Sequence, residues 1–83
     1  LSPAYPNAFY PTRAISYQLQ AASFVKLVVY DIQGREVARL VDGYRAAGSY
    51  ELTFDGSDLA SGVYLARLNI NGNTLTQKLL LIK

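Results

Sequence analysis

The sequence predicts an all-β fold, because its apolar residues follow the spacing of strands and not that of helices. Apolar and polar residues alternate along 14–20 and 49–55, as they do in strands with one buried face. The runs 24–32 and 63–70 are almost continuously apolar and rich in β-branched and aromatic residues, which is typical of central strands. No segment keeps a helical stripe, so we expect strands joined by turns.

Turn signals indicate where these strands end. Three prolines confine residues 3–11 to an edge strand or an extended strap, since proline cannot donate a hydrogen bond to a ladder. Asp31 and Gly34 take the first and fourth places of a type I turn, which predicts a bulged hairpin with Gly34 in the left-handed region. Asn71-Gly72 predicts a two-residue type I′ hairpin. Residues 41–49 contain two glycines and are predicted to form a looser connection.

Seven short strands with turns at this spacing favour a seven-stranded, immunoglobulin- or fibronectin-III-like two-sheet antiparallel sandwich. A small barrel is the alternative way to close such a sheet. The predicted strands are residues 4–9, 13–20, 24–32, 35–41, 49–55, 63–70 and 74–82.

The stretch LASGVY, residues 59–64, stands just before the sixth predicted strand. In many sandwiches a tyrosine near the start of this strand hydrogen-bonds the backbone upstream of it, in a tyrosine corner. Leu59, Gly62 and Tyr64 have the order that such a corner requires. We therefore predict that Tyr64 orients a strand and takes no part in chemistry.

Composition limits the classes of function. A chain of 83 residues suits one domain, and without Cys or His it has no disulfides and is a poor candidate for a zinc site. The net charge is +2, and the basic residues are scattered, with acids interleaved among those of the middle of the chain, unlike the clustered cations of nucleic-acid-binding proteins. No apolar run is long enough to cross a bilayer. The chain begins as if cut from a longer protein, so we expect residues 1–83 to be a single module excised from a larger secreted protein.

No catalytic constellation and no cofactor site is predicted, because the common nucleophile–base pairs need His or Cys. Asp55 and Asp58 flank a Gly-Ser pair and could be taken for a calcium loop or an acid pair. The segment lacks the ligand spacing of a hand-type calcium loop, so a polar turn is the favoured interpretation and a weak cation site the alternative.

Tyrosines offer one further binding hypothesis, since flat rings stack on sugars. Tyr17, Tyr50 and Tyr64 fall on apolar faces of predicted strands and are expected in the core. Tyr5, Tyr10 and Tyr44 fall in predicted loops and are the candidates for carbohydrate contact.

The order of these motifs resembles the C-terminal sorting domain carried by cargo of the bacterial type IX secretion system, an immunoglobulin-like module related to one found in flagellar hook-capping proteins. The similarity covers nearly the whole chain and includes the segments PNAFYPTRAISYQL and TQKLLLIK. One departure is Ala8, which follows Pro6-Asn7 where the family often has a second proline. The most specific matching positions are Asp31, Gly34, Arg35, Val37, Leu59, Gly62 and Tyr64.

The resemblance implies a non-catalytic address label at the end of a larger cargo protein. The parent would enter the periplasm by an ordinary signal peptide and then be recognised by the outer-membrane shuttle and translocon. A sortase-like protease would remove the domain and could anchor the cargo at the cell surface. The alternative is a carbohydrate-binding or structural spacer module of a secreted polysaccharide-degrading enzyme.

The closing strand is the predicted recognition element. If it lies at a sheet edge, its backbone could pair with a receptor strand while its aliphatic side chains enter pockets. Alternation gives this run two apolar faces, so we expect part of it to complete the core as well. The residues concerned are Lys78, Leu79, Leu80, Leu81, Ile82 and Lys83.

Overall fold

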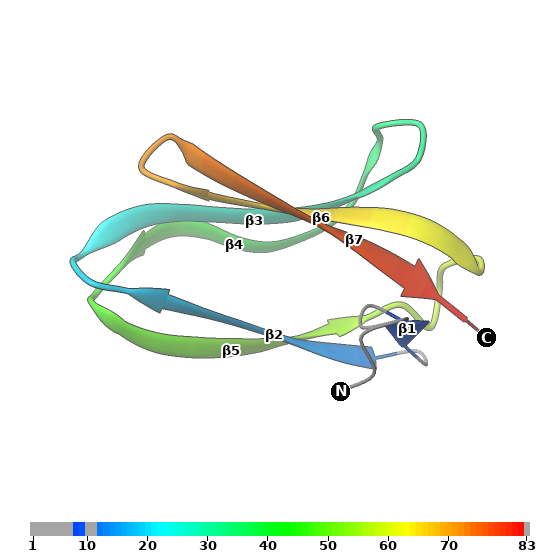
Figure 1. Ribbon diagram of the computed structural model, residues 1–83, viewed down its shortest axis with the longest axis horizontal. Helices are drawn as coiled ribbons and strands as arrows, with labels where there is room; N and C mark the ends of the chain where they lie inside the picture. The colour runs from blue at the N-terminus through cyan, green and yellow to red at the C-terminus, as the bar shows by residue number, and fades with distance from the viewer. Residues whose placement is uncertain (1–7, 10–11, 83) are drawn as a thin grey trace.

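Two facing β-sheets make up the protein in a computed structural model that describes residues 8–9 and 12–82 (Figure 1). The larger sheet has the strand order β1-β7-β6-β3-β4, and the smaller one pairs β2 with β5. The described residues form no helix, so the all-β prediction is confirmed. The strands are β1 (Ala8–Phe9), β2 (Thr12–Leu19), β3 (Ser23–Asp31), β4 (Glu36–Arg45), β5 (Gly48–Asp55), β6 (Gly62–Ile70) and β7 (Asn73–Leu81).

The chain changes sheet three times between β2 and β6. It passes from β2 to the larger sheet for β3 and β4, returns for β5, and crosses again for β6, which lies beside β3. All pairings are antiparallel except that of β1 with β7, where Ala8 and Phe9 lie parallel to Leu80 and Leu81.

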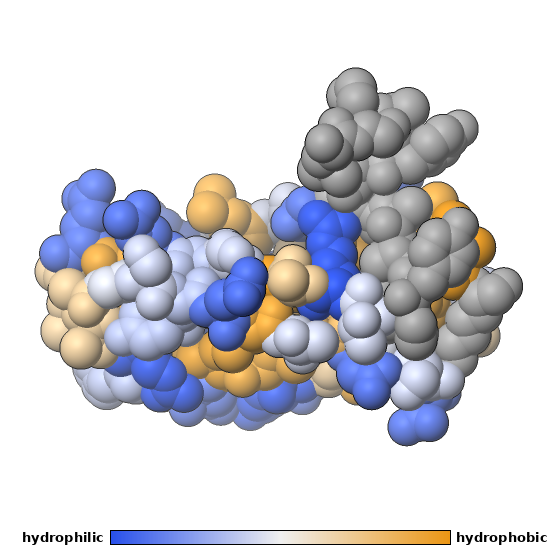
Figure 2. Space-filling model, turned by 90° about the horizontal axis from the view of Figure 1, so that it is seen from below, coloured by the Kyte–Doolittle hydropathy of each residue, from blue (hydrophilic) through white to orange (hydrophobic). Residues whose placement is uncertain are grey.

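The core fills the space between the sheets in two apolar clusters. Ile15 and Leu40 contact both clusters and so connect the two halves. One cluster holds Val29, Phe54, Tyr64, Ala66, Leu79 and Leu81, and the other holds Tyr17, Leu19, Val25, Leu27 and Val41. Figure 2 views the molecule from the side of β2 and β5, where polar residues cover much of the surface and apolar residues emerge in patches.

Most predicted strands match the structure closely. The strands predicted at 13–20, 24–32, 49–55, 63–70 and 74–82 correspond to β2, β3, β5, β6 and β7, with ends that differ by at most one residue. Of the strand predicted at 4–9, the structure describes only Ala8–Phe9, which is extended; the rest lies outside the described residues.

The looser connection predicted for residues 41–49 is wrong. β4 continues to Arg45, and its second half pairs with β3, where Gly43 lies opposite Val25 and Arg45 opposite Ser23. The connection to β5 is therefore only Ala46-Ala47. Local glycine content suggested a turn, but pairing with a buried neighbouring strand outweighs that local preference.

Both predicted hairpin turns are confirmed. Gly34 has a φ of 83°, its N–H donates to the Asp31 carbonyl oxygen at 3.0 Å, and the Asp31 N–H donates to the Arg35 carbonyl oxygen at 2.9 Å. Asn71 and Gly72 have φ values of 51° and 90°, as a type I′ turn requires at both central positions. Glycine tolerates these left-handed conformations at little cost, and asparagine is among the few other residues that adopt them readily.

Two irregularities in the β3–β4 ladder change which β4 residues share a face. The register shifts between Leu27 and Val28 and again between Val29 and Tyr30, so β4 gains an extra residue at each point. As a result Glu36, Arg39 and Asp42 lie opposite Tyr30, Val28 and Lys26, three alternate residues of β3. A regular strand would place β4 residues spaced by three on alternating faces.

Candidate functional site

The last strand, β7, has one side largely open. It pairs with β6 from end to end, from Asn73 opposite Ile70 to Leu81 opposite Gly62. On its other side β1 pairs only with Leu80 and Leu81. Within residues 8–9 and 12–82, no other strand pairs with this side of β7, so its backbone from Asn73 to Leu79 forms an unpaired sheet edge.

The first six residues of β7, Asn73 to Lys78, are exposed on both faces of the sheet. Leu75 lies on the face turned toward the smaller sheet and is still 67% exposed. Figure 1 shows why, because the hairpin end of β7 lies away from the β2–β5 layer. This part of the strand is therefore accessible through its backbone and through both rows of side chains.

The second half of β7 is divided between core and surface. Leu79 and Leu81 are buried, with 0% and 1% of their surface exposed. Leu80 and Ile82 are half-buried, and Lys78 is exposed. Of the residues predicted to be recognised, Leu79 and Leu81 therefore support the core, Lys78, Leu80 and Ile82 remain accessible, and Lys83 lies outside the described residues.

An apolar groove runs beside the unpaired edge. It has a volume of about 360 Å³ and is lined by residues of β2, β3, β6 and β7, among them Ile15, Leu68 and Leu75. It therefore lies on the side of the sandwich where β2 and β7 are the outermost long strands. An extended chain arriving there would meet both free backbone groups and an apolar surface.

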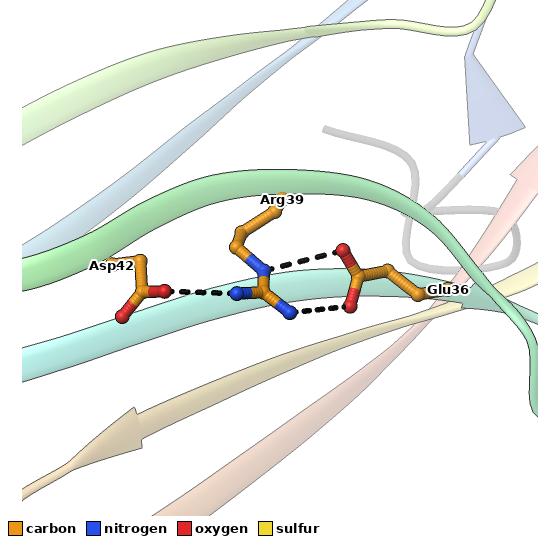
Figure 3. A network of polar contacts seen from close by, with 3 residues as sticks. All are labelled: Glu36, Arg39 and Asp42. Atoms are coloured by element: carbon orange, nitrogen blue, oxygen red, sulfur yellow. Dashed lines mark hydrogen bonds and ion pairs between the residues drawn. The ribbon is translucent and has the colours of Figure 1, made fainter.

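Charged side chains are distributed unevenly between the two edges of the large sheet, the β6–β7 side and β4. From residue 59 to residue 83 the sequence has three cations, Arg67, Lys78 and Lys83, and no carboxylate side chain. On β4, Arg39 bonds Glu36 through Nε and Nη2 at 3.2 and 2.9 Å and Asp42 through Nη1 at 2.9 Å (Figure 3). The side-chain bonds from Arg39 lower the pKa of Glu36, and the Glu36 carboxylate raises the pKa of Arg39.

The residues that matched the family motif shape the backbone at one end of the sandwich. Asp31 Oδ1 accepts hydrogen bonds from the N–H groups of Gln33 and Arg35 at 2.9 and 3.0 Å, and Oδ2 accepts one from Arg35 Nε at 3.0 Å. The backbone N–H of Arg35 is the main reason that the pKa of Asp31 is lowered. Val37 packs against the core.

The motif residues of the second half of the chain are Leu59, Gly62 and Tyr64. They adjoin the Asp31 turn across the β3–β6 ladder, where Tyr64 lies directly opposite Asp31. Tyr64 Oη donates a 2.6 Å hydrogen bond to the carbonyl oxygen of Ala60, so the predicted bond to upstream backbone is present. Leu59 packs against the core, and Gly62 begins β6. These residues build turns and a corner, and none of them lies on the open part of β7.

Sequence reasoning missed a second bond of the same kind. Tyr50 Oη donates to the carbonyl oxygen of Ala46 at 2.6 Å, and its ring stacks on that of Tyr17 at a centroid distance of 5.2 Å. The signal was present as a repeated pattern, since Ala46-x-Gly48-x-Tyr50 has the same spacing as Ala60-x-Gly62-x-Tyr64.

The remaining candidate sites are polar turns or fall partly outside the structure. Asp55 Oδ1 accepts a bond from the Ser57 N–H at 2.9 Å, and the Leu59 N–H donates to the Gly56 carbonyl oxygen at 2.9 Å, so the predicted polar turn is confirmed. In the part of the chain that the structure describes, no three metal-ligating side chains gather. Its described residues also contain no helix that could span a membrane.

Of the tyrosines proposed for carbohydrate contact, the structure describes Tyr44 alone. Tyr44 is on β4, not in a loop; it is 77% exposed and packs edge-on against Phe24. Tyr5 and Tyr10 lie outside the described residues.

Comparison with known proteins gives one match. The model of a family described as "Secretion system C-terminal sorting domain" matches residues 3–83. No curated protein and no solved structure matches the chain.

Proposed function

The chain belongs to the family of secretion system C-terminal sorting domains and is a sorting signal for type IX secretion, and we propose that the secretion machinery recognises it through the open edge of β7. Such a signal implies a cargo domain on the N-terminal side and export to the cell surface or the extracellular space. The carbohydrate-binding and spacer alternatives are not favoured.

The observation that carries this proposal is the segment from Asn73 to Lys78, which is exposed on both faces and whose outer edge pairs with no strand within residues 8–9 and 12–82. In a two-residue hairpin the closing pair exchanges both hydrogen bonds, and the pairs then alternate along the ladder. Starting from Ile70 and Asn73, this alternation directs the N–H groups of Thr74, Thr76 and Lys78 away from β6. An extended segment of the machinery can add to this edge as a further strand.

Side chains next to this edge supply the specificity. Lys78, Leu80 and Ile82 keep part of their surface available, and we include Lys83 because it follows Ile82 in the sequence. Leu79 and Leu81 hold β7 against the core and act on recognition through its position.

We base three further proposals, on the fold type, the parent protein and the export route, on the family and on the strand order. We propose that the domain is an immunoglobulin-like sandwich, because β2 and β5 face a sheet in which β3 and β6 are neighbours, and because Tyr64 makes a corner bond. We also propose that residues 1–83 are one module of a larger secreted protein. It passes through the periplasm, is recognised by the outer-membrane shuttle and translocon, and is removed by a sortase-like protease.

A transport experiment tests the function directly. Residues 1–83 are fused behind a periplasm-targeted fluorescent protein in a bacterium that has the type IX system, and the fusion is expected outside the cell. A strain lacking the translocon is the control and should retain the fusion in the periplasm. Retention in both strains, with the fusion folded and intact, would contradict the proposal.

A further inference from the structure

A second site with a different chemistry lies on the outer face of the large sheet, beyond the β7 edge. Its lining residues come from three adjacent strands: Lys26, Val28 and Tyr30 on β3, Arg67 and Asn69 on β6, and Thr74 on β7. They surround a depression of about 210 Å³. We propose that this depression binds a phosphate-type oxyanion.

The register places the polar residues of this depression on one face of the large sheet. Lys26 lies opposite Asn69, and Asn69 lies opposite Thr74, so these three residues form one row across β3, β6 and β7. Arg67 lies opposite Val28 in the next row on the same face. The Cα atoms of Lys26 and Arg67 are therefore diagonal neighbours, about 7–8 Å apart, so both long side chains can reach an anion held between them.

Two contacts hold donor groups in place before any ligand arrives. The Arg67 guanidinium carbon lies 5.5 Å from the centre of the Tyr30 ring, in a cation–π contact. Asn69 Nδ2 donates to Thr74 Oγ1 at 3.0 Å, and Asn69 Oδ1 accepts the Gly72 N–H at 3.0 Å. Because the Thr74 oxygen already accepts a bond, its own hydroxyl proton is available for an anion.

The balance of charge favours an anionic ligand. None of the six lining residues is acidic, and neither Lys26 nor Arg67 forms an ion pair in the part of the chain that the structure describes. The nearest acids are Glu36 and Asp42 on β4, on the far side of β3, and Arg39 binds both. Asp42 lies opposite Lys26, and the charge of Lys26 also helps to lower the pKa of Glu36, so both carboxylates reduce the field of Lys26; no carboxylate side chain lies on β6 or β7.

Phosphate matches this donor set better than a carboxylate does. An arginine fork, an ammonium group and a hydroxyl can together serve three oxygens around one phosphorus atom. The oxyanion can belong to free phosphate or to the headgroup of a phospholipid, and both sources present the same oxygens to the site.

Nuclear magnetic resonance of the ¹⁵N-labelled 83-residue chain distinguishes these cases. Inorganic phosphate is titrated at constant ionic strength, with sodium chloride as the reference. We expect saturable shifts confined to the signals of the lining residues. A parallel titration uses vesicles of phosphatidic acid in phosphatidylcholine, with pure phosphatidylcholine vesicles as reference; phosphate-sensitive binding to the first alone identifies a lipid source, and binding of free phosphate alone identifies a soluble one.

Matched variants separate a defined site from diffuse attraction. Arg67→Gln should weaken phosphate binding on the order of tenfold, since it removes a charge-assisted pair of bonds, and Arg67→Lys should retain part of the affinity. Arg13→Gln removes one positive charge from β2, on the smaller sheet and away from the site, and should leave phosphate binding within about twofold. Shifts that never saturate, that sodium chloride reproduces, or that both glutamine variants weaken equally would overturn the proposal. The readout does not depend on secretion, so the sorting function can hold or fail independently.

Discussion

The hydroxyl of Tyr64 donates a 2.6 Å hydrogen bond to the backbone carbonyl oxygen of Ala60, four residues upstream. The bond ties the start of β6 to the loop that crosses from the smaller sheet. Tyr64 is only 6% exposed, whereas Tyr50 makes the same contact with Ala46 near the surface. One kind of bond therefore occurs in two environments, and the two can be compared directly.

Replacing Tyr64 with phenylalanine is expected to lower the free energy of unfolding by about 1–2 kcal/mol, because a partly buried hydrogen bond to the Ala60 carbonyl oxygen is lost. Tyr50→Phe is the matched control and should cost less, since water can replace its hydroxyl at the surface. Urea denaturation of the two variants measures the difference. Equal losses would show that burial does not set the value of this bond.

At Gly34 the cost of substitution is conformational. A Cβ atom there would meet no other atom within 4 Å, but the φ of 83° is unfavourable for a branched side chain. We expect Gly34→Val to be less stable than Gly34→Asn by about 1 kcal/mol, as measured by the urea midpoint. Equal stabilities would mean that the turn relaxes to another conformation.

Stability should fall in acid partly through Asp31. Its pKa in the folded chain lies below the ordinary value of 3.8, chiefly because the Arg35 N–H bonds the carboxylate. The charged carboxylate therefore favours the folded state above pH 3.8, and this contribution is lost as the pH falls through the lowered pKa. Asp31→Asn should be less stable than the parent at neutral pH, and the difference should shrink in acid. A difference independent of pH would exclude this charge as its cause.

Leu79 and Leu75 belong to the same strand but should respond differently to truncation. Leu79→Ala is expected to cost about 2–5 kcal/mol, because Leu79 is fully buried. Leu75→Ala should change stability by less than about 0.5 kcal/mol, because Leu75 is 67% exposed. Chemical denaturation measures both. A small domain has only a few kcal/mol to lose, so deletion of residues 79–83 would test folding rather than recognition.

A proline in β7 tests the open edge without touching the core. Thr76→Pro removes an N–H that faces away from β6, so the domain should stay folded while export of the fluorescent fusion is lost. Thr76→Ala keeps the N–H and should be exported normally. Circular dichroism and the unfolding midpoint establish that both variants fold. Normal export of a folded Thr76→Pro fusion would exclude strand addition at this position.

Local signals were sufficient to predict β2, β3, β5, β6 and β7, both hairpin turns and the Tyr64 bond. The hairpins depend on residues next to one another in the chain, such as Asn71 and Gly72, whose backbone preferences suit the turn. The Tyr64 bond also spans only four residues. Interactions of short range are encoded where they occur, so a single sequence can show them.

Features that depend on pairing between strands were harder to predict. The extent of β4 and the alignment of Glu36, Arg39 and Asp42 both require the register with β3, including its two shifts. The recognition element was predicted in the last strand, but the division between buried Leu79 and exposed Lys78 depends on how far the smaller sheet covers β7. The cationic depression joins β3 to β6 and β7, and no local pattern brings these residues together.

The dependence of β7 on β6 has a consequence for quality control in the cell. Pairing with β6 and the burial of Leu79 and Leu81 hold the segment from Asn73 to Leu81 in its extended shape. Under the proposed recognition of the β7 edge, the secretion machinery binds a folded strand and not the sequence alone, so a chain that has misfolded at this point would not be recognised. Secretion would then be restricted to chains whose sorting domain has folded, and no separate folding check would be needed.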